Sequence, residues 1–126
     1  MKIKLSKAEE QLMQHLWDLK KAFMKDLIEQ YDNPKPANTT IATLLKRMYD
    51  KGYITYESLG RNRLYIPLVS KAEYSKGEFQ DLLQNFFGNS SRQFASFFTR
   101  NTNLTQEELT ELRSIIDQEI SKKKTT

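Results

Sequence analysis

The chain has 126 residues, of which 38% are hydrophobic and 29% are charged, and its formal net charge at pH 7 is +4. This length suits one compact unit, or a small domain with an appendage, because single cores commonly form at roughly 100–150 residues. No apolar run approaches the ~20 residues that span a bilayer. The first ten residues carry no apolar stretch of the kind found in secretory signals. We therefore expect a cytoplasmic protein that inserts into no membrane.

The residue types exclude several kinds of chemistry. Zero cysteines leave no disulfide framework, cysteine zinc site or thiol nucleophile. A single histidine, His15, excludes most zinc enzymes and Ser–His–Asp designs. The sequence therefore predicts a protein that is not an enzyme and that uses no cofactor and no metal ion.

Positive charge is concentrated in the first part of the chain. Residues 1–70 hold 12 Lys and Arg against 8 Asp and Glu, whereas residues 71–126 hold 8 of each. Between residues 35 and 63, six basic residues stand against two acidic ones. A basic patch is typical of a surface that meets a polyanion, so this segment is the first candidate for a nucleic-acid interface.

Three helix starts are marked by capping boxes, at Ser6–Glu9, Ser70–Glu73 and Thr105–Glu108. In such a box the hydroxyl accepts a hydrogen bond from the backbone three residues on, and the glutamate reaches back. The first box opens an amphipathic helix of about four turns. Its apolar face is predicted to consist of Ala8, Leu12, Leu16 and Leu19.

A second helix is predicted over residues 23–31, and the two prolines of residues 32–36 end it. The third helix begins near Asn38, a favourable N-cap residue, and Gly52 ends it as the residue after the cap. Its opposite face presents threonines and cations. Its apolar stripe has the i, i+3, i+4, i+7 spacing and consists of Ile41, Leu44, Leu45 and Met48.

A β-hairpin with a basic tip follows the third helix. Residues 53–59 are rich in aromatic and β-branched side chains, and this character resumes at residues 64–66 before Pro67. The Gly60–Arg63 segment between them supplies turn residues. Three helices followed by a hairpin is the pattern of a winged helix-turn-helix, whose third helix enters the major groove of DNA.

We expect a recognition helix at about 38–51 and a wing at about 54–66, on the DNA backbone or in the minor groove. An ordinary solvated helix can show a similar polar face. The prediction therefore depends on combining that face with the basic tip, the prolines and the local charge. Threonine, alanine, lysine and arginine suit contacts to phosphates, thymine methyls and guanine. The predicted DNA-binding residues are Asn38, Thr39, Thr40, Ala42, Thr43, Lys46, Arg47, Arg61 and Arg63.

The remaining segment predicts helices only, at residues 71–87, around 94–98 and at 106–122. Its aromatic and aliphatic side chains exceed what roughly 55 residues bury well alone. We expect a second copy of the chain to cover them, forming a homodimer, rather than a ligand. The predicted dimerisation residues are Phe79, Leu82, Leu83, Phe86, Phe87, Phe94, Phe97, Phe98, Leu109, Leu112, Ile116 and Ile120.

The predicted fold class is mainly α with a small β-hairpin. A winged helix-turn-helix DNA-binding domain occupies residues 1–70, and a helical dimerisation domain occupies residues 71–126. Two-fold symmetry of a homodimer implies a palindromic DNA site, with half-sites about one helical turn apart or a multiple of it.

Four segments of the chain resemble the penicillinase-repressor family. They are Leu5–Glu9 leading to Leu16-Trp17, residues 35–48 followed by residues 51–54, residues 60–61 with 64–65 and 67–69, and residues 104–109. That family contains the β-lactamase and methicillin-resistance repressors and the copper-responsive repressor of copper ATPases. The resemblance implies a homodimeric transcriptional repressor of a double-stranded DNA operator.

The resemblance also bears on induction. In the β-lactam branch, a membrane sensor peptidase acts as partner, and the repressor is cleaved at an Asn-Phe bond. The corresponding pair here is Phe97-Phe98, and Asn85-Phe86 is the only Asn-Phe pair. The copper branch uses a C-terminal cysteine motif, which the absence of cysteine excludes. The inducing signal therefore stays open.

Two alternatives stay open as well. The chain can be a ligand-sensing winged-helix regulator of another family, with a small molecule among its phenylalanines. It can also be a winged-helix module that binds another protein and has no role on DNA.

Overall fold

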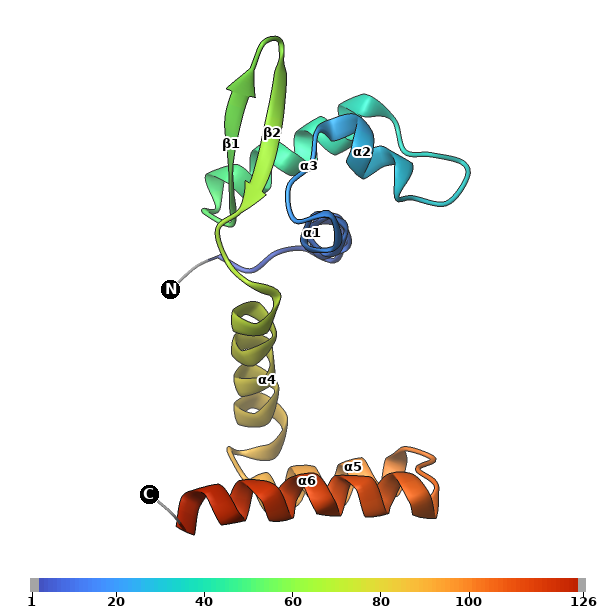
Figure 1. Cartoon of the computed structure of the whole chain (residues 1–126), viewed down its shortest axis with the longest axis vertical. Coiled ribbons are helices and arrows are strands. Elements are labelled where there is room, and N and C mark those ends of the chain that lie inside the picture. The colour runs from blue at the N-terminus through green and yellow to red at the C-terminus, as the bar shows by residue number, and fades with distance from the viewer. Residues whose placement is uncertain (1–2, 125–126) are drawn as a thin grey trace. The chain divides into compact units, whose positions relative to one another are not determined.

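The computed structural model describes residues 3–124, which form six helices and one β-hairpin (Figure 1). The mainly α fold class with a small hairpin is confirmed. In chain order the elements are α1 (Lys7–Leu19), α2 (Met24–Glu29), α3 (Asn38–Asp50), β1 (Ile54–Leu59), β2 (Asn62–Pro67), α4 (Lys71–Phe87), α5 (Ser91–Asn101) and α6 (Gln106–Lys124). None of these helices is both long enough and apolar enough to cross a membrane, over residues 3–124.

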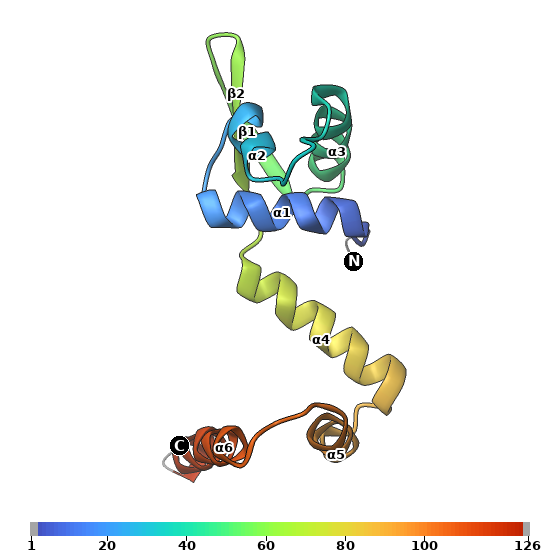
Figure 2. The same cartoon turned by 90° about the vertical axis from the view of Figure 1, so that its right-hand side faces the viewer.

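The first three helices and the hairpin share one hydrophobic core. Helix α1 lies across one end of α2 and α3, and the hairpin turn points away from α1 (Figures 1 and 2). The apolar stripe predicted for α3 faces this core, with Ile41, Leu45 and Met48 buried and Leu44 partly buried. The buried residues are Leu5, Leu12, Met13, Leu16, Ala22, Leu27, Ile41, Leu45, Met48, Tyr53, Ile54 and Tyr65.

The hairpin is antiparallel, and its register places Tyr56 opposite Tyr65. Its turn passes through Gly60, whose φ of +65° favours glycine. Ala22, between α1 and α2, adds an isolated bridge to β2. The Ala22 N–H donates to the Tyr65 carbonyl at 3.1 Å, and the Tyr65 N–H donates to the Ala22 carbonyl at 2.8 Å. The wing is therefore tied to the helices through backbone hydrogen bonds.

Most helix boundaries match their predicted positions, with two corrections at the caps. Helix α3 begins at Asn38 itself, and Ala37 occupies the N-cap position without a side-chain hydrogen bond. Helix α2 is shorter than residues 23–31, since Phe23 is its N-cap and Gln30 its C-cap. The Lys35 ammonium donates to the carbonyls of Glu29 and Tyr31 near this end of the helix. Ala8 is exposed, so it is not part of the apolar face of α1.

The chain divides into two compact units, Met1–Glu78 and Phe79–Thr126. The first unit continues past residue 70 because the first turns of α4 pack on it. The Tyr74 hydroxyl donates to Glu10, and its ring lies 5.7 Å from that of Trp17. The Trp17 indole N–H in turn donates to the carbonyl of Val69 at 2.9 Å. Burial, followed by the bond to Glu10, raises the pKa of Tyr74.

Across residues 79–124, the second unit contains a small aromatic cluster but no buried residue. No side chain of α4, α5 or α6 is buried across residues 71–124. Phe94 lies edge-on to Phe79 at 5.0 Å and to Phe87 at 5.6 Å. Figure 2 shows α5 and α6 as two separate helices. Phe86 nevertheless remains 75% exposed and Phe97 55% exposed.

A buried ion pair joins the end of α3 to the start of α1. The Glu9 side chain is 1% exposed, and its Oε1 lies 2.5 Å from the Lys51 ammonium. The same carboxylate accepts the Ser6 N–H at 2.7 Å, completing the capping box of α1. Lys51 also donates to the Lys4 carbonyl at 3.1 Å. Both charges are therefore compensated within the protein.

Removing one member of this pair should destabilise the first unit strongly. We predict that Lys51→Met lowers the free energy of unfolding by about 3–5 kcal/mol, because it leaves the Glu9 carboxylate buried without its cation. Lys46→Met, which breaks an exposed ion pair on the same helix, should cost about 0–1 kcal/mol. Urea denaturation measures both. Equal losses in the two variants would contradict the assignment.

The same pair predicts a pH dependence of stability. Burial raises the pKa of Glu9, but the hydrogen bonds and charge of Lys51 and Ser6 outweigh it, so that the net pKa lies below 4.5. A lowered native-state pKa gives stability that is present above about pH 4.5 and lost as the pH falls through the native value. We predict that Glu9→Gln flattens the fall in unfolding free energy between neutral and acidic pH. An unchanged slope in urea titrations would refute this.

Candidate nucleic-acid interface

The face of α3 opposite the core is fully accessible. All seven of its predicted DNA-binding side chains are exposed. The helix presents this face because its apolar stripe is held by the core shared with α1 and α2. Those exposed residues are Asn38, Thr39, Thr40, Ala42, Thr43, Lys46 and Arg47.

Two side chains on this face already have partners within the helix. The Thr43 hydroxyl donates to the Thr39 carbonyl at 2.9 Å, which leaves the lone pairs of its oxygen available as acceptors. The Lys46 ammonium lies 3.1 Å from the Asp50 carboxylate, and both side chains are exposed. An exposed pair of this kind contributes about 0–1 kcal/mol, so Lys46 can exchange Asp50 for another anion at small cost.

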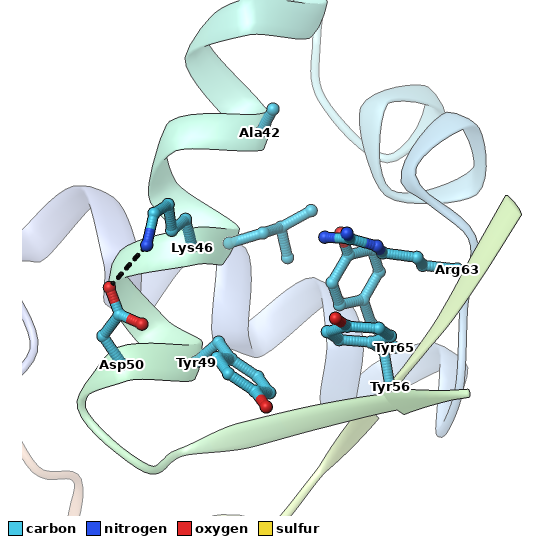
Figure 3. Close-up of a pocket in the computed structure, with 8 residues that line it drawn as sticks. Ala42, Lys46, Tyr49, Asp50, Tyr56, Arg63 and Tyr65 are labelled. Carbon is cyan, nitrogen blue, oxygen red and sulfur yellow. Dashed lines mark hydrogen bonds and ion pairs between the residues drawn. The ribbon is translucent and has the colours of Figure 1, made fainter. Parts of the chain in front are cut away.

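A groove lies between α3 and the hairpin (Figure 3). Ala42 and Lys46 line it from α3, and Arg63 lines it from β2. The Arg63 guanidinium lies over the Tyr56 ring, with its Cζ atom 4.4 Å from the ring centroid. The groove floor includes Tyr65, which is 9% exposed and packs in the core. Cations from α3 and from β2 therefore border the same groove.

A second groove lies between the hairpin and the start of α2. Arg61, Asn62 and Arg63 line it from the hairpin, and Phe23 and Lys25 line it from the other side. Lys25 and Asn62 were missed by the sequence prediction. Lys25 lies outside the basic segment of residues 35–63 from which the DNA-binding surface was predicted. Its proximity to the wing depends on the bridge between Ala22 and Tyr65.

The structure brings together some of the predicted residues and leaves others apart. Ala42 and Arg63 border both grooves, Lys46 borders the first and Arg61 the second. The other predicted residues border neither groove and lie on the open face of α3: they are Asn38, Thr39, Thr40, Thr43 and Arg47. Grooves and helix face together form a surface that carries several cations.

A sequence model described as penicillinase repressor matches residues 5–118. The chain belongs to the penicillinase repressor family. A penicillinase repressor from Bacillus licheniformis is 25% identical over 121 residues, which cover 95% of this chain and 94% of that protein. The methicillin resistance regulatory protein MecI of Staphylococcus aureus (strain N315) is 26% identical over 114 residues, covering 90% and 93%.

A solved structure supports the fold of this penicillinase repressor family member. The solution structure of the DNA binding domain of the repressor BlaI has a TM-score of 0.51 and 26% sequence identity. It covers 59% of this chain and 94% of that domain. The predicted winged-helix fold and the predicted family are therefore both confirmed. Family members are transcriptional repressors, and this chain shares their DNA-binding winged-helix fold.

Proposed function

We propose that the chain represses transcription by binding a palindromic operator as a homodimer. In this proposal α3 enters the major groove, and the hairpin lies on the backbone or in the adjacent minor groove. The observation that carries the proposal is that Lys46 of α3 and Arg63 of β2 border the same groove. A single polyanion lying along α3 can meet both.

The side chains available on α3 suit base and phosphate contacts. The Ala42 methyl can contact a thymine methyl, and Arg47 can bind guanine or phosphate. The Thr43 hydroxyl keeps lone pairs to accept from a base, although its hydrogen is used within the helix. Lys46 exchanges its exposed partner Asp50 for a phosphate. On the wing side Lys25, with Arg61, offers additional phosphate contacts.

The direct test compares the DNA upstream of the chain's own coding sequence with a shuffled duplex of the same length and composition. Fluorescence anisotropy at a fixed moderate salt concentration measures both dissociation constants. We expect tighter binding to the upstream duplex, by at least about 10³-fold. Equal binding to both duplexes would refute sequence-specific repression, and no salt-dependent binding to either would favour a protein-interaction module.

Salt dependence separates the roles of the cations. We predict that Lys46→Ala and Arg61→Ala each reduce the slope of log K against log salt by about 0.9, because each loses one phosphate contact. Thr43→Ala should change the preference among duplex sequences and leave the slope unchanged. Lys7→Ala, an exposed lysine on α1, serves as the control. Unchanged slopes for Lys46→Ala and Arg61→Ala would show that neither side chain contacts a DNA phosphate.

The homodimer part of the proposal is supported by the exposed apolar surface of the second unit. Exposed apolar areas of this extent are typical of interfaces between chains. Leu82, Phe86 and Phe97 border a groove between α4 and α5, while Ile116 and Ile120 border a separate apolar surface on α6. In a two-fold dimer the same apolar surfaces of both copies face each other. A second copy of the chain can therefore cover both surfaces.

A charge within this surface should dissociate the dimer. We predict that Phe97→Asp shifts the protein to a monomer in analytical ultracentrifugation, because the carboxylate would have to be desolvated on association. Gln84→Asp, an exposed polar position on α4, is the matched control and should stay dimeric. A Phe97→Asp protein that sediments as wild type would place the interface elsewhere.

The protein that would relieve repression, a membrane sensor peptidase, remains a prediction. The sequence resemblance implies a membrane sensor peptidase, and Phe97 and Phe98 stand where that branch has its Asn-Phe pair. Both phenylalanines lie within α5. Incubation with the sensor peptidase of a β-lactam-responsive relative, followed by mass spectrometry, tests whether any bond in α5 is cleaved.

A further inference from the structure

Tyr56 and Arg63 project from the same face of the hairpin. The register pairs Tyr56 with Tyr65 and Ser58 with Arg63. Side chains alternate between the two faces of a strand, so Tyr56, Tyr65 and Arg63 share the face that borders α3. Arg63 is the diagonal neighbour of Tyr56, within reach for a long side chain.

Two other aromatic rings pack against the ring of Tyr56. It lies 5.3 Å from the ring of Tyr49 on α3 and 5.8 Å from the ring of Tyr65 on β2. The Arg63 guanidinium rests on this ring at 4.4 Å, within the range of a cation–π interaction. Figure 3 shows the guanidinium pointing across the groove toward α3. Arg63 is thus oriented before any ligand arrives.

The neighbouring cations are held differently. Lys46 is paired with Asp50 at 3.1 Å, and Arg61 lies in the exposed turn of the hairpin. Among residues 3–124, no carboxylate lies within ion-pair distance of Arg63. A guanidinium that stacks through its face keeps its N–H donors directed outward along its edge. Arg63 therefore combines a fixed direction with unneutralised donors.

We propose that Arg63 is the specificity-determining residue of the wing and that Tyr56 is its positioning residue. This inference rests on the DNA-binding function proposed above. A phosphate can be met by any mobile cation, whereas acceptors on base edges require donors with a fixed direction. Because its guanidinium points toward α3, Arg63 contacts base-edge acceptors next to the site that α3 occupies.

The test measures discrimination rather than affinity alone. The probes are the upstream duplex and its shuffled counterpart, and the readout is the ratio of their dissociation constants. Arg63→Lys keeps the charge but loses the stacked fork, and Tyr56→Leu removes the ring. We expect each to lower the ratio about 10-fold, with an unchanged salt slope. Tyr56→Phe, which keeps the ring, should behave as wild type, and Arg92→Lys, at an exposed position of α5 outside the proposed interface, should leave the ratio unchanged.

A double variant tests whether the two residues act together. If Tyr56 acts through Arg63, then Tyr56→Leu should cause no further loss in the Arg63→Lys background. A wild-type ratio in Arg63→Lys would overturn the role of Arg63. A wild-type ratio in Tyr56→Leu, a loss in Tyr56→Phe or additive losses would overturn the positioning role.

Thermal melting by circular dichroism checks that each variant is folded. If Tyr56→Leu does not fold, Tyr56→Met takes its place. The two proposals fail in different ways. If the wild-type protein itself binds both duplexes equally, the DNA-binding proposal fails and this inference falls with it. If only the variants behave as wild type, this inference alone fails.

Discussion

The attachment of the hairpin to the helices at Tyr65 is the constraint on which the proposed DNA-binding surface depends. Two backbone hydrogen bonds join this residue to Ala22, and its side chain is buried in the shared core. An isolated hairpin of two strands is marginally stable at best in water. Fixing β2 at its centre therefore gives the wing a defined position beside α3. The grooves on either side of the hairpin follow from that position.

A second anchor lies at the carboxyl end of α3. Lys51 follows the last residue of the helix and reaches the buried Glu9 carboxylate of α1. The pair holds the carboxyl end of α3 while the apolar stripe holds its length. Both anchors act on the buried side of the helix, so its exposed face is free for other contacts. The contacts that fix α3 therefore also leave its polar face accessible.

The second unit follows a different principle. Its helices bury no side chain across residues 79–124, even though phenylalanines gather between α4 and α5. A cluster of this kind is incomplete in a single chain, because apolar side chains at a water interface contribute little stability. The proposed dimer completes it. The first unit, by contrast, has a buried core of its own.

Local patterns predicted much of the fold. The stripe from Ile41 to Met48 identified α3, and the residues around Gly60 identified the hairpin turn. Side-chain partners across the fold could not be predicted in this way. The stacking of Arg63 on Tyr56 depends on the strand register, and the burial of Glu9 depends on a lysine 42 residues away. Lys25 joins the wing only through the bridge at Ala22, which carries no local signal.

The central claim is that α3 and the wing read DNA as one surface, presented twice by a two-fold dimer. Selection of bound sequences from a pool of random duplexes at about 150 mM salt tests this claim most directly. The account predicts enrichment of an inverted repeat, with half-sites about one helical turn apart or a multiple of that distance. Recovery of unrelated sequences without a shared motif would contradict it.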